Sequence, residues 1–198
     1  MPKLLLATFN RGKIKEYRLL LDDLGYEITT LAQEGITKVI TESQNSYEQN
    51  ARLKAIAYAK SSHLLTLADD SGLEVDALNG EPGVRSARFA GEAATDADRV
   101  SFLLARLDNV PWEKRTARFK CLVAIATPAG QCHTCCGECP GIIALEPKGR
   151  NGFGYDPIFF LPKQGKTMAQ LSLKLKNQIS HRARASQKAR QVLQQFHI

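Results

Sequence analysis

The chain of 198 residues is 43% hydrophobic and 24% charged, and it carries a formal net charge of +7. These values are ordinary for globular proteins and exclude collagen, coiled coils and wholesale disorder. No apolar run reaches the ~18 residues of a membrane span, and the N-terminal run is too short for a secretory signal. We therefore expect one cytoplasmic domain over residues 1–198, with no membrane association.

The N-terminal part of the chain predicts a strand followed by two helices. The apolar run over residues 3–8 is typical of a buried strand. Asn10 is placed to cap a helix with apolar residues at three- and four-residue spacing, and Gly25 is placed to end it. Ser46 and Gln49 have the spacing of a capping box, which predicts the start of a second helix.

The middle of the chain predicts a strand, a helix and a hairpin. Residues 63–68 are typical of a buried strand, which we expect to end in the Asp-Asp-Ser-Gly turn that follows. Thr95 is placed to cap a third helix. Alternating apolar residues over 117–125 predict a long strand that returns antiparallel over residues 131–136.

A further strand over residues 142–146 and an amphipathic helix opened by Ser180 complete the pattern. Strands interleaved with helices predict an α/β fold, with a mixed sheet flanked by helices. We find no internal repeat and no low-complexity linker. This pattern is consistent with one domain that has one or two lobes.

Positive charge gathers toward the C-terminus. Residues 157–198 contain five lysines and three arginines but no acidic residue. Such a segment favours an anionic partner, either nucleic acid, a phosphorylated metabolite or acidic lipid. A solvated basic helix is the alternative.

Four of the five cysteines lie in the run CHTCCGEC, from Cys132 to Cys139. Two CxxC pairs are typical of zinc or cluster ligands, but here no spacer separates them. If the run is a strand, its alternate side chains face opposite ways and cannot converge on one ion. We therefore favour reduced thiols over a metal site.

Two segments in the N-terminal half carry candidate phosphate and metal chemistry. LATFNRGKIKE places Asn10 and Lys13 at a helix start, where free amides and the helix dipole favour an anion. A plain helix cap beside a surface lysine is the alternative. LADDSGLEVD places Asp69 and Asp70 at a strand end, where a carboxylate suits Mg²⁺. Because successive side chains face opposite ways, at most one of the two points into a site, and an ordinary polar turn is the alternative.

Two segments in the C-terminal half carry candidate base-recognition chemistry. GRNGFGYDPIFF holds Phe153 and Tyr155 on a glycine-rich loop, where a base could stack on an aromatic ring. The alternative is a loop that its aromatic residues hold in the core. LKNQISHRARA gathers Lys176, His181 and Arg182 around a helix start, where they could donate to the keto oxygen of a base.

Taken together, in this order, the four segments resemble the inosine triphosphate pyrophosphatase family of non-canonical purine nucleoside triphosphate pyrophosphatases. The resemblance runs from Leu4 to about Ala185 and rests on LADDSGLEVDALNGEPGVRSARFAG, GFGYDPIFF and ISHR. It implies an elongated α/β fold with two lobes around a central cleft, and usually a homodimer. It also implies Mg²⁺-dependent hydrolysis of ITP, dITP and XTP to the nucleoside monophosphate and pyrophosphate.

The resemblance also implies roles for individual residues. Asp70 corresponds to the general base, and Asp70 and Glu42 correspond to the metal-site carboxylates. The remaining matched residues are implied to contact the substrate: Thr8, Phe9, Asn10, Arg11, Gly12, Lys13, Lys54, Ser71, Phe153, Gly154, Tyr155, Asp156, Lys176, His181 and Arg182. Some positions depart from the usual family pattern, namely Phe9, Gln49, Lys174 and Leu175. None of these departures removes Asp70, Glu42, Lys13 or Arg182, so we expect activity to be retained.

Two other functions compete with this hypothesis. Maf-like nucleotide pyrophosphatases share the architecture but prefer pyrimidine or modified nucleotides, and the SHR segment and GFGYDP loop favour the purine branch. A nucleic-acid-binding module would use the basic C-terminal segment and would not need Asp70. Because exposed stacking strands and arginine-rich recognition motifs are not evident, we expect a purine nucleoside triphosphate as substrate and no stable nucleic-acid partner.

Overall fold

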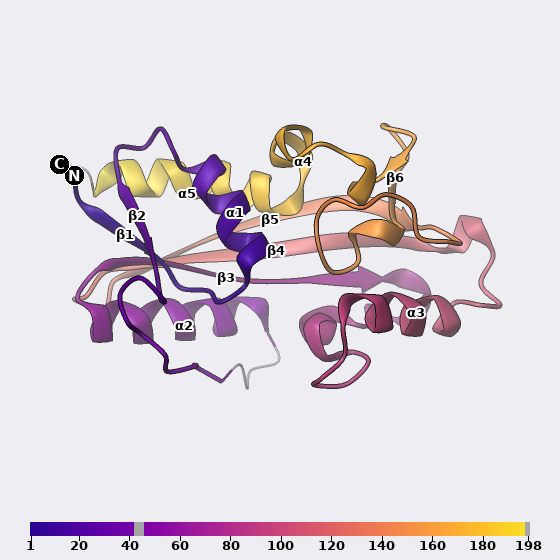
Figure 1. Ribbon diagram of the computed structural model, residues 1–198, viewed down its shortest axis with the longest axis horizontal. Helices are drawn as coiled ribbons and strands as arrows, with labels where there is room; N and C mark the ends of the chain where they lie inside the picture. Colours follow the sequence, from indigo (N-terminus) through magenta and orange to yellow (C-terminus); the bar gives the residue numbers. More distant parts are fainter. Residues whose placement is uncertain (42–45, 197–198) are drawn as a thin grey trace. The chain divides into compact units, whose positions relative to one another are not determined.

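The computed structural model describes residues 1–41 and 46–196. The helices are α1 (Arg11–Leu20), α2 (Tyr47–Ser62), α3 (Asp96–Arg106), α4 (Leu173–Ile179) and α5 (His181–Gln195). The strands are β1 (Lys3–Leu6), β2 (Glu27–Thr30), β3 (Leu65–Val75), β4 (Thr116–Ala126), β5 (Cys132–Ile143), β6 (Phe159–Leu161) and β7 (Lys166–Thr167). Figure 1 shows these elements along the chain.

The strands form one mixed sheet in the order β2-β1-β3-β4-β5-β6-β7. β1 runs parallel to both β2 and β3, whereas β6 runs antiparallel to both β5 and β7. The mixed sheet and its flanking helices confirm the predicted α/β class. Within the described residues, no helix is long and apolar enough to cross a membrane.

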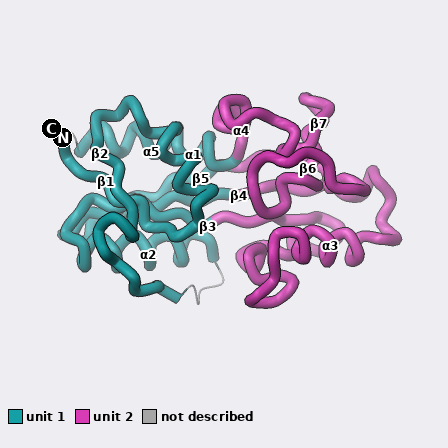
Figure 2. Tube along the Cα trace, in the orientation of Figure 1, with its two compact units in different colours: residues 1–70, 121–137, 181–198 teal, residues 71–120, 138–180 magenta. Residues whose placement is uncertain are grey.

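The chain divides into two compact units, and neither is continuous in sequence (Figure 2). Unit 1 comprises residues 1–70, 121–137 and 181–198, and unit 2 comprises residues 71–120 and 138–180. The two units agree with the expectation of two lobes. The cleft and the single-domain organisation stay predictions.

Unit 1 packs helices on both faces of its strands (Figure 1). Leu4 and Leu6 of β1 contact the apolar cluster that includes residues of α1 and α5, whereas Leu5 contacts the cluster that includes α2. All three leucines are fully buried. The alternation follows from the strand geometry, since successive side chains of β1 face opposite sides.

Unit 2 has its own core around β4 and β5. Leu103 of α3, Phe119 of β4 and Ile143 of β5 belong to one buried apolar cluster. The rings of Phe119 and Phe159 lie with their centroids 4.3 Å apart in that cluster. Thr95 caps α3 as predicted, because it accepts a hydrogen bond from the Asp98 amide while the Asp98 carboxylate accepts one from the Thr95 amide.

The predicted start of α2 at Ser46 is confirmed without its capping bond, whereas the predicted end of α1 at Gly25 was wrong. The side chain of Ser46 makes no capping hydrogen bond, although Ser46 does precede α2. The buried residues Ala51, Ala55 and Tyr58 instead hold α2 against the sheet. Helix α1 ends at Leu20, ahead of Gly25, which adopts a positive φ of 72° only after an intervening turn.

Three predicted strand ends were also wrong. β3 does not stop at residue 68 but runs through the acidic pair to Val75. It can continue because Asp69 and Asp70 both find partners inside the fold. β5 is longer than the predicted 131–136, and it includes the first two residues of the strand predicted over 142–146. Buried and exposed residues alternate along β5, but the buried positions include glycine and cysteine, so the sequence did not show the alternation of large apolar side chains typical of a strand.

The cysteine run lies in β5 and shows the facing expected of a strand. Cys135 belongs to the α1 and α5 side of unit 1, whereas Cys132 packs on the α2 side. All five cysteines of the chain are unbridged. Among residues 1–41 and 46–196, no group of three or more His, Cys, Asp or Glu side chains is arranged to hold a metal ion.

Candidate active site

The acidic pair of β3 points to opposite faces of the sheet. The Asp69 carboxylate meets α1, because Lys13 Nζ lies 3.0 Å from Asp69 Oδ1. The Asp70 carboxylate meets α2, because Asn50 Nδ2 donates to Asp70 Oδ2 at 2.9 Å. Asp69 is 1% exposed and Asp70 is 5% exposed, so both carboxylates lie inside unit 1. The two side chains therefore face opposite ways, as the strand geometry predicted.

Asn10 caps the helix that carries Lys13. Its side-chain oxygen accepts from the Lys13 amide at 3.0 Å and so caps α1, as predicted. Thr8 Oγ1 in turn accepts from the Asn10 amide at 3.2 Å. The predicted phosphate loop therefore lies at a capped helix start, whose amides and dipole favour an anion.

A second lysine approaches Asp69 from the other side of the sheet. Lys54 of α2 donates from Nζ to the backbone carbonyl of Asp69 at 2.7 Å. Two ammonium groups, from helices on opposite faces, thus contact the same residue of β3. This arrangement places positive charge around the strand segment that carries Asp70.

Arg182 lies in a buried ion pair rather than on an open surface. Its NH1 lies 2.5 Å from Glu16 Oε2, its NH2 lies 3.4 Å from Asp69 Oδ2, and the residue is 1% exposed. Burial opposes its charge, but Glu16 and Asp69 outweigh burial and hold the pKa of Arg182 above its ordinary value. Arg182 therefore remains a cation within unit 1.

The same charges control the acidity of Asp69. Burial alone would raise the pKa of Asp69, but the positive charges of Lys13, Arg182 and Lys54 together lower it well below its ordinary range. Asp69 is therefore ionised at neutral pH. Cys121 lies beside it, with Sγ 3.7 Å from Asp69 Oδ2, and burial raises the pKa of this thiol to about 12.

Unit 2 holds the glycine-rich loop in a defined conformation. The Asp156 carboxylate forms an ion pair with Lys176 and also accepts from the Phe153 amide at 3.0 Å. The Lys176 ammonium lies 4.8 Å from the centroid of the Phe153 ring. Gly152 has a positive φ of 78°, and a Cβ at this position would overlap the Asp156 carboxylate. The loop therefore requires glycine where it passes the ion pair.

Comparison with known proteins decides the family. A model of the Ham1 family matches residues 4–192. The chain belongs to the Ham1 family. It is 49% identical over 197 residues to a Desulforamulus reducens protein named dITP/XTP pyrophosphatase, a match that covers 99% of this chain and 98% of the relative.

Other Ham1-type relatives agree in sequence and in fold. A Bacillus subtilis protein named dITP/XTP pyrophosphatase is 44% identical over 194 residues, with 98% of each chain covered. The structure of a HAM1 protein from Coxiella burnetii matches with a TM-score of 0.88 and 40% identity, covering 98% of this chain and all of that one. The resemblance stated from the sequence motifs is thus confirmed.

The predicted Ham1 site residues divide between the two units. Unit 1 contains the following: Thr8, Phe9, Asn10, Arg11, Gly12, Lys13, Lys54, Asp70, His181 and Arg182. Unit 2 contains the following: Ser71, Phe153, Gly154, Tyr155, Asp156 and Lys176. The predicted metal ligand Glu42 lies outside the described residues.

Two predicted contact residues occupy different environments. Phe9 is 47% exposed beside the capped start of α1. Tyr155 is 4% exposed, and its hydroxyl donates to the Ser86 carbonyl at 2.9 Å. Tyr155 thus packs in the core of unit 2, as in the alternative that the sequence left open for this loop. Phe153 is the partly exposed aromatic ring of the same loop.

Sequence reasoning missed the partners that hold these side chains. Glu16 gave no signal, because an acidic residue inside a helix is usually exposed. Asn50 was visible only as a helix residue, and its bond to Asp70 depends on tertiary packing. The pairing of Arg182 with Glu16 joins positions 166 residues apart, which no local pattern records.

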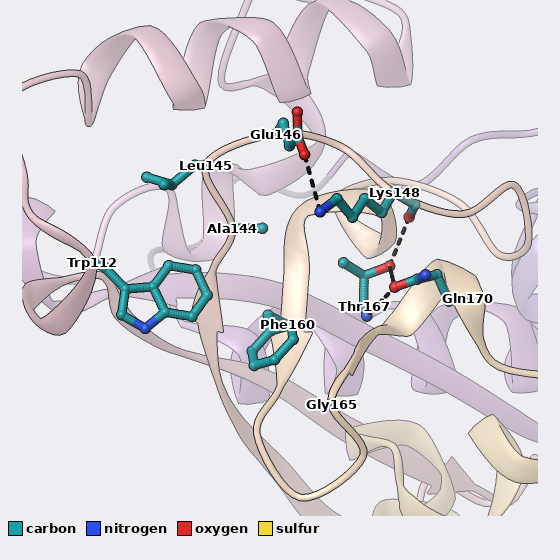
Figure 3. A pocket seen from close by; sticks show the side chains of 9 residues that line it. All are labelled: Trp112, Ala144, Leu145, Glu146, Lys148, Phe160, Gly165, Thr167 and Gln170. Carbon is teal, nitrogen blue, oxygen red and sulfur yellow. Dashed lines mark hydrogen bonds and ion pairs between the residues drawn. The ribbon is translucent and has the colours of Figure 1, made fainter.

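Unit 2 also contains a cavity of about 560 Å³ that holds none of the predicted site residues (Figure 3). Trp112 and Phe160 form part of its wall, with their ring centroids 5.4 Å apart. Glu146 and Lys148 form an ion pair at its edge, 3.0 Å apart and largely exposed. No charged lining residue is buried there, so the cavity carries no argument about the reaction.

Proposed function

We propose that this protein hydrolyses the non-canonical purine nucleoside triphosphates ITP, dITP and XTP to the nucleoside monophosphate and pyrophosphate, with Mg²⁺. Such an enzyme would cleanse the nucleotide pool of deaminated purines. Relatives named dITP/XTP pyrophosphatase, 49% and 44% identical over nearly the whole chain, support this assignment. A cytoplasmic homodimer is part of the same proposal, on the strength of the family resemblance.

The observation that carries the proposal is that Lys13 and Lys54 both contact Asp69, the residue that precedes Asp70 in β3. A triphosphate brings about four negative charges, which cationic side chains and helix-end amides offset as charge moves to the leaving pyrophosphate. Lys13 and the capped start of α1 supply such groups. In this mechanism they bind the phosphates and stabilise the departing group.

Asp70 would act as the general base. Its carboxylate would accept a proton from a water molecule that attacks phosphorus in line with the leaving group. The amide of Asn50 donates to Asp70 Oδ2 and so orients the carboxylate. Orientation of this kind keeps one oxygen directed for proton transfer.

We propose Mg²⁺ as the cofactor on the strength of the family resemblance. Mg²⁺ prefers oxygen ligands and is commonly held by one or two carboxylates together with substrate phosphates and water. Asp70 supplies a carboxylate of this kind, and Glu42 is the second carboxylate that the resemblance implies. The ion would neutralise phosphate charge and polarise the bond that breaks.

Base recognition is proposed to use the loop of unit 2. Phe153 would stack on the base, and Asp156 would accept from a ring N–H. Lys176 of this unit would donate toward the 6-oxo group, which hypoxanthine and xanthine have and adenine lacks. The base contacts that the resemblance implies for His181 and Arg182 stay predictions, and Arg182 is paired with Glu16 and Asp69 in unit 1. A site that leaves buried donors unpaired with adenine would reject it strongly.

The test is a substrate panel with product analysis. The purified protein is incubated with ITP, dITP, XTP, GTP, ATP or dTTP, with Mg²⁺ or with EDTA, and nucleoside monophosphate and pyrophosphate are quantified. We expect kcat/KM for the deaminated purines to exceed that for ATP by about 100-fold or more. We also expect it to exceed that for dTTP and GTP, although guanine shares the 6-oxo group and its rejection rests on the 2-position, and activity to be lost in EDTA. Equal turnover of GTP and ITP would contradict the proposed specificity. Release of inorganic phosphate in place of pyrophosphate would contradict the proposed reaction.

A further inference from the structure

The peptide groups on both sides of Phe153 are held by carboxylates within unit 2. The Phe153 amide donates to Asp156 Oδ2 at 3.0 Å, and the Gly154 amide donates to Asp96 Oδ2 at 2.7 Å. The backbone at Phe153 is thus fixed from both ends. Asp156 is a predicted contact residue, but Asp96 belongs to α3, far from the loop in sequence.

The Asp96 carboxylate is itself oriented by Arg99. One carboxylate oxygen pairs with Arg99 NH2, while the other accepts from Gly154. Arg99 NH1 donates to the carbonyls of Ala94, at 2.5 Å, and Ala87, at 3.0 Å. The guanidinium is therefore anchored to the backbone that precedes α3, and it restrains the Asp96 carboxylate.

The neighbouring contacts do not replace this bond. Tyr155 is fixed through its hydroxyl by the Ser86 carbonyl, and Asp156 is fixed by Lys176. Both act after residue 154 in the chain. Gly154 has a positive φ of 62°, and a Cβ added there would meet no atom within 4 Å, so no side chain packs against this side of the residue. The Phe153 carbonyl accepts a long bond of 3.3 Å from the Asp156 amide, so the 2.7 Å bond from the Gly154 amide to Asp96 is the shorter and charged contact of the peptide between Phe153 and Gly154.

We propose that Asp96 is a positioning residue for base recognition, because it sets the orientation in which Phe153 presents its ring. This inference rests on the proposed function, since it assigns Phe153 to a purine base. Loss of the Gly154 bond lets the Phe153 backbone rotate, which weakens stacking on the base without touching the reacting phosphorus. The effect therefore falls on KM rather than on kcat.

The experiment compares three variants with the wild type. Asp96→Ala removes the acceptor, whereas Asp96→Asn keeps an oxygen at the same place. Asp98→Ala is the matched control, because Asp98 caps the same helix through Thr95 and makes no hydrogen bond to the loop among the contacts described. Amide hydrogen exchange of the peptide around residues 150–157 is measured beside kcat and KM for dITP.

We expect exchange at Gly154 to be about tenfold faster in Asp96→Ala, since a hydrogen bond to a charged group is lost. KM for dITP rises about tenfold while kcat changes by less than about twofold. Asp96→Asn can accept the Gly154 bond through its amide oxygen but loses the pairing with Arg99, so we expect both measurements to lie between those of the wild type and Asp96→Ala. Asp98→Ala has wild-type loop exchange and KM, although its melting temperature falls by a few degrees, on the order of one lost cap.

The inference is overturned if Asp96→Ala shows wild-type exchange at Gly154, if Asp98→Ala raises KM equally, or if Asp96→Asn is as impaired as Asp96→Ala. A wild-type protein that releases no pyrophosphate from dITP, ITP or XTP overturns the proposed function and the specificity role together. Exchange separates the two failures, because it reports on the loop contact in the absence of any substrate.

Discussion

The ammonium group of Lys13 lies 3.0 Å from the carboxylate of Asp69, although 56 positions separate the two residues. This contact joins the helix that begins in the predicted phosphate loop to the strand that carries Asp70. Lys13 is 14% exposed and Asp69 is 1% exposed, so solvent screens the pair only weakly. The buried carboxylate of Asp69 thus holds the Lys13 ammonium in place and balances its charge.

The substitution Asp69→Asn tests this coupling through stability. It removes the negative charge that faces Lys13 and Arg182, and we expect the free energy of unfolding at pH 7 to fall by about 3 kcal/mol. Urea denaturation measures the change. Asp23→Asn is the control, because its pairing with Arg190 is largely exposed, and we expect no resolvable loss. Equal losses in the two variants would contradict a special role for the buried pair.

The same pair predicts how stability depends on pH. Because the pKa of Asp69 is lowered in the folded protein, its contribution is fully present above the pKa of the unfolded chain, about 3.9. The contribution is lost as pH falls below that value, since the unfolded chain then takes up the proton first. The stability difference between wild type and Asp69→Asn should therefore shrink below about pH 4. A constant difference from pH 7 to pH 3 would contradict it.

Lys13 is expected to matter more for the reaction than for the fold. Removing one positioned cation from a phosphate site costs about 100-fold or more in rate, so we expect Lys13→Ala to lower kcat/KM for dITP by that factor. Lys15→Ala is the matched control, because Lys15 is exposed on the same helix. If both variants lose activity equally, the effect comes from general charge and not from the placed ammonium.

The helix cap and the acidic strand show what local sequence can predict. Asn10 was predicted to cap α1, and the cap is present, because capping depends only on neighbouring residues. β1 and the apolar helix faces were predictable for the same reason. β3 was predicted to end at its acidic residues, since Asp-Ser-Gly is typical of a turn. It continues because Lys13 and Asn50, distant in sequence, satisfy both carboxylates.

The residues of the candidate site could be predicted from local motifs, but the tertiary contacts that hold them could not. Motifs named the residues that the structure gathers at the start of α1 and on β3, including Lys13 and Asp70. No local pattern indicated that Arg182 is buried against Glu16, or that Asp96 holds the loop at Gly154. Those pairs form only when α5 and α3 reach their places in units 1 and 2, respectively.

A methyl group added at Gly137 of β5 is expected to destabilise the fold. A Cβ at this position would overlap the carbonyl oxygen of His181 and the amide nitrogen of Ala185, so α5 lies directly on the strand there. We expect Gly137→Ala to lower the free energy of unfolding by about 2–3 kcal/mol. Gly130→Ala is the control, with a positive φ of 93° but open space, and we expect about 1 kcal/mol. A thermal melt in which Gly130→Ala is the less stable variant would refute the close approach.

The cysteines should react very differently with alkylating agents. Burial raises the pKa of Cys121 to about 12, so this thiol stays protonated and shielded through pH 9. Cys136 is exposed on β5. We expect iodoacetamide at pH 8 to label Cys136 first and to reach Cys121 only after denaturation, as read by peptide mass spectrometry. Early labelling of Cys121 in the folded protein would contradict its buried place beside Asp69.

The most direct measurement is the rate of pyrophosphate release from dITP by Asp70→Asn compared with the wild type, at saturating Mg²⁺. The substitution keeps the shape of the side chain and can keep the bond to Asn50 if the amide oxygen faces it, but it removes the group that takes up a proton. We predict a fall in kcat of at least about 1,000-fold with the melting temperature little changed. A folded Asp70→Asn protein that releases pyrophosphate at the wild-type rate would contradict the account.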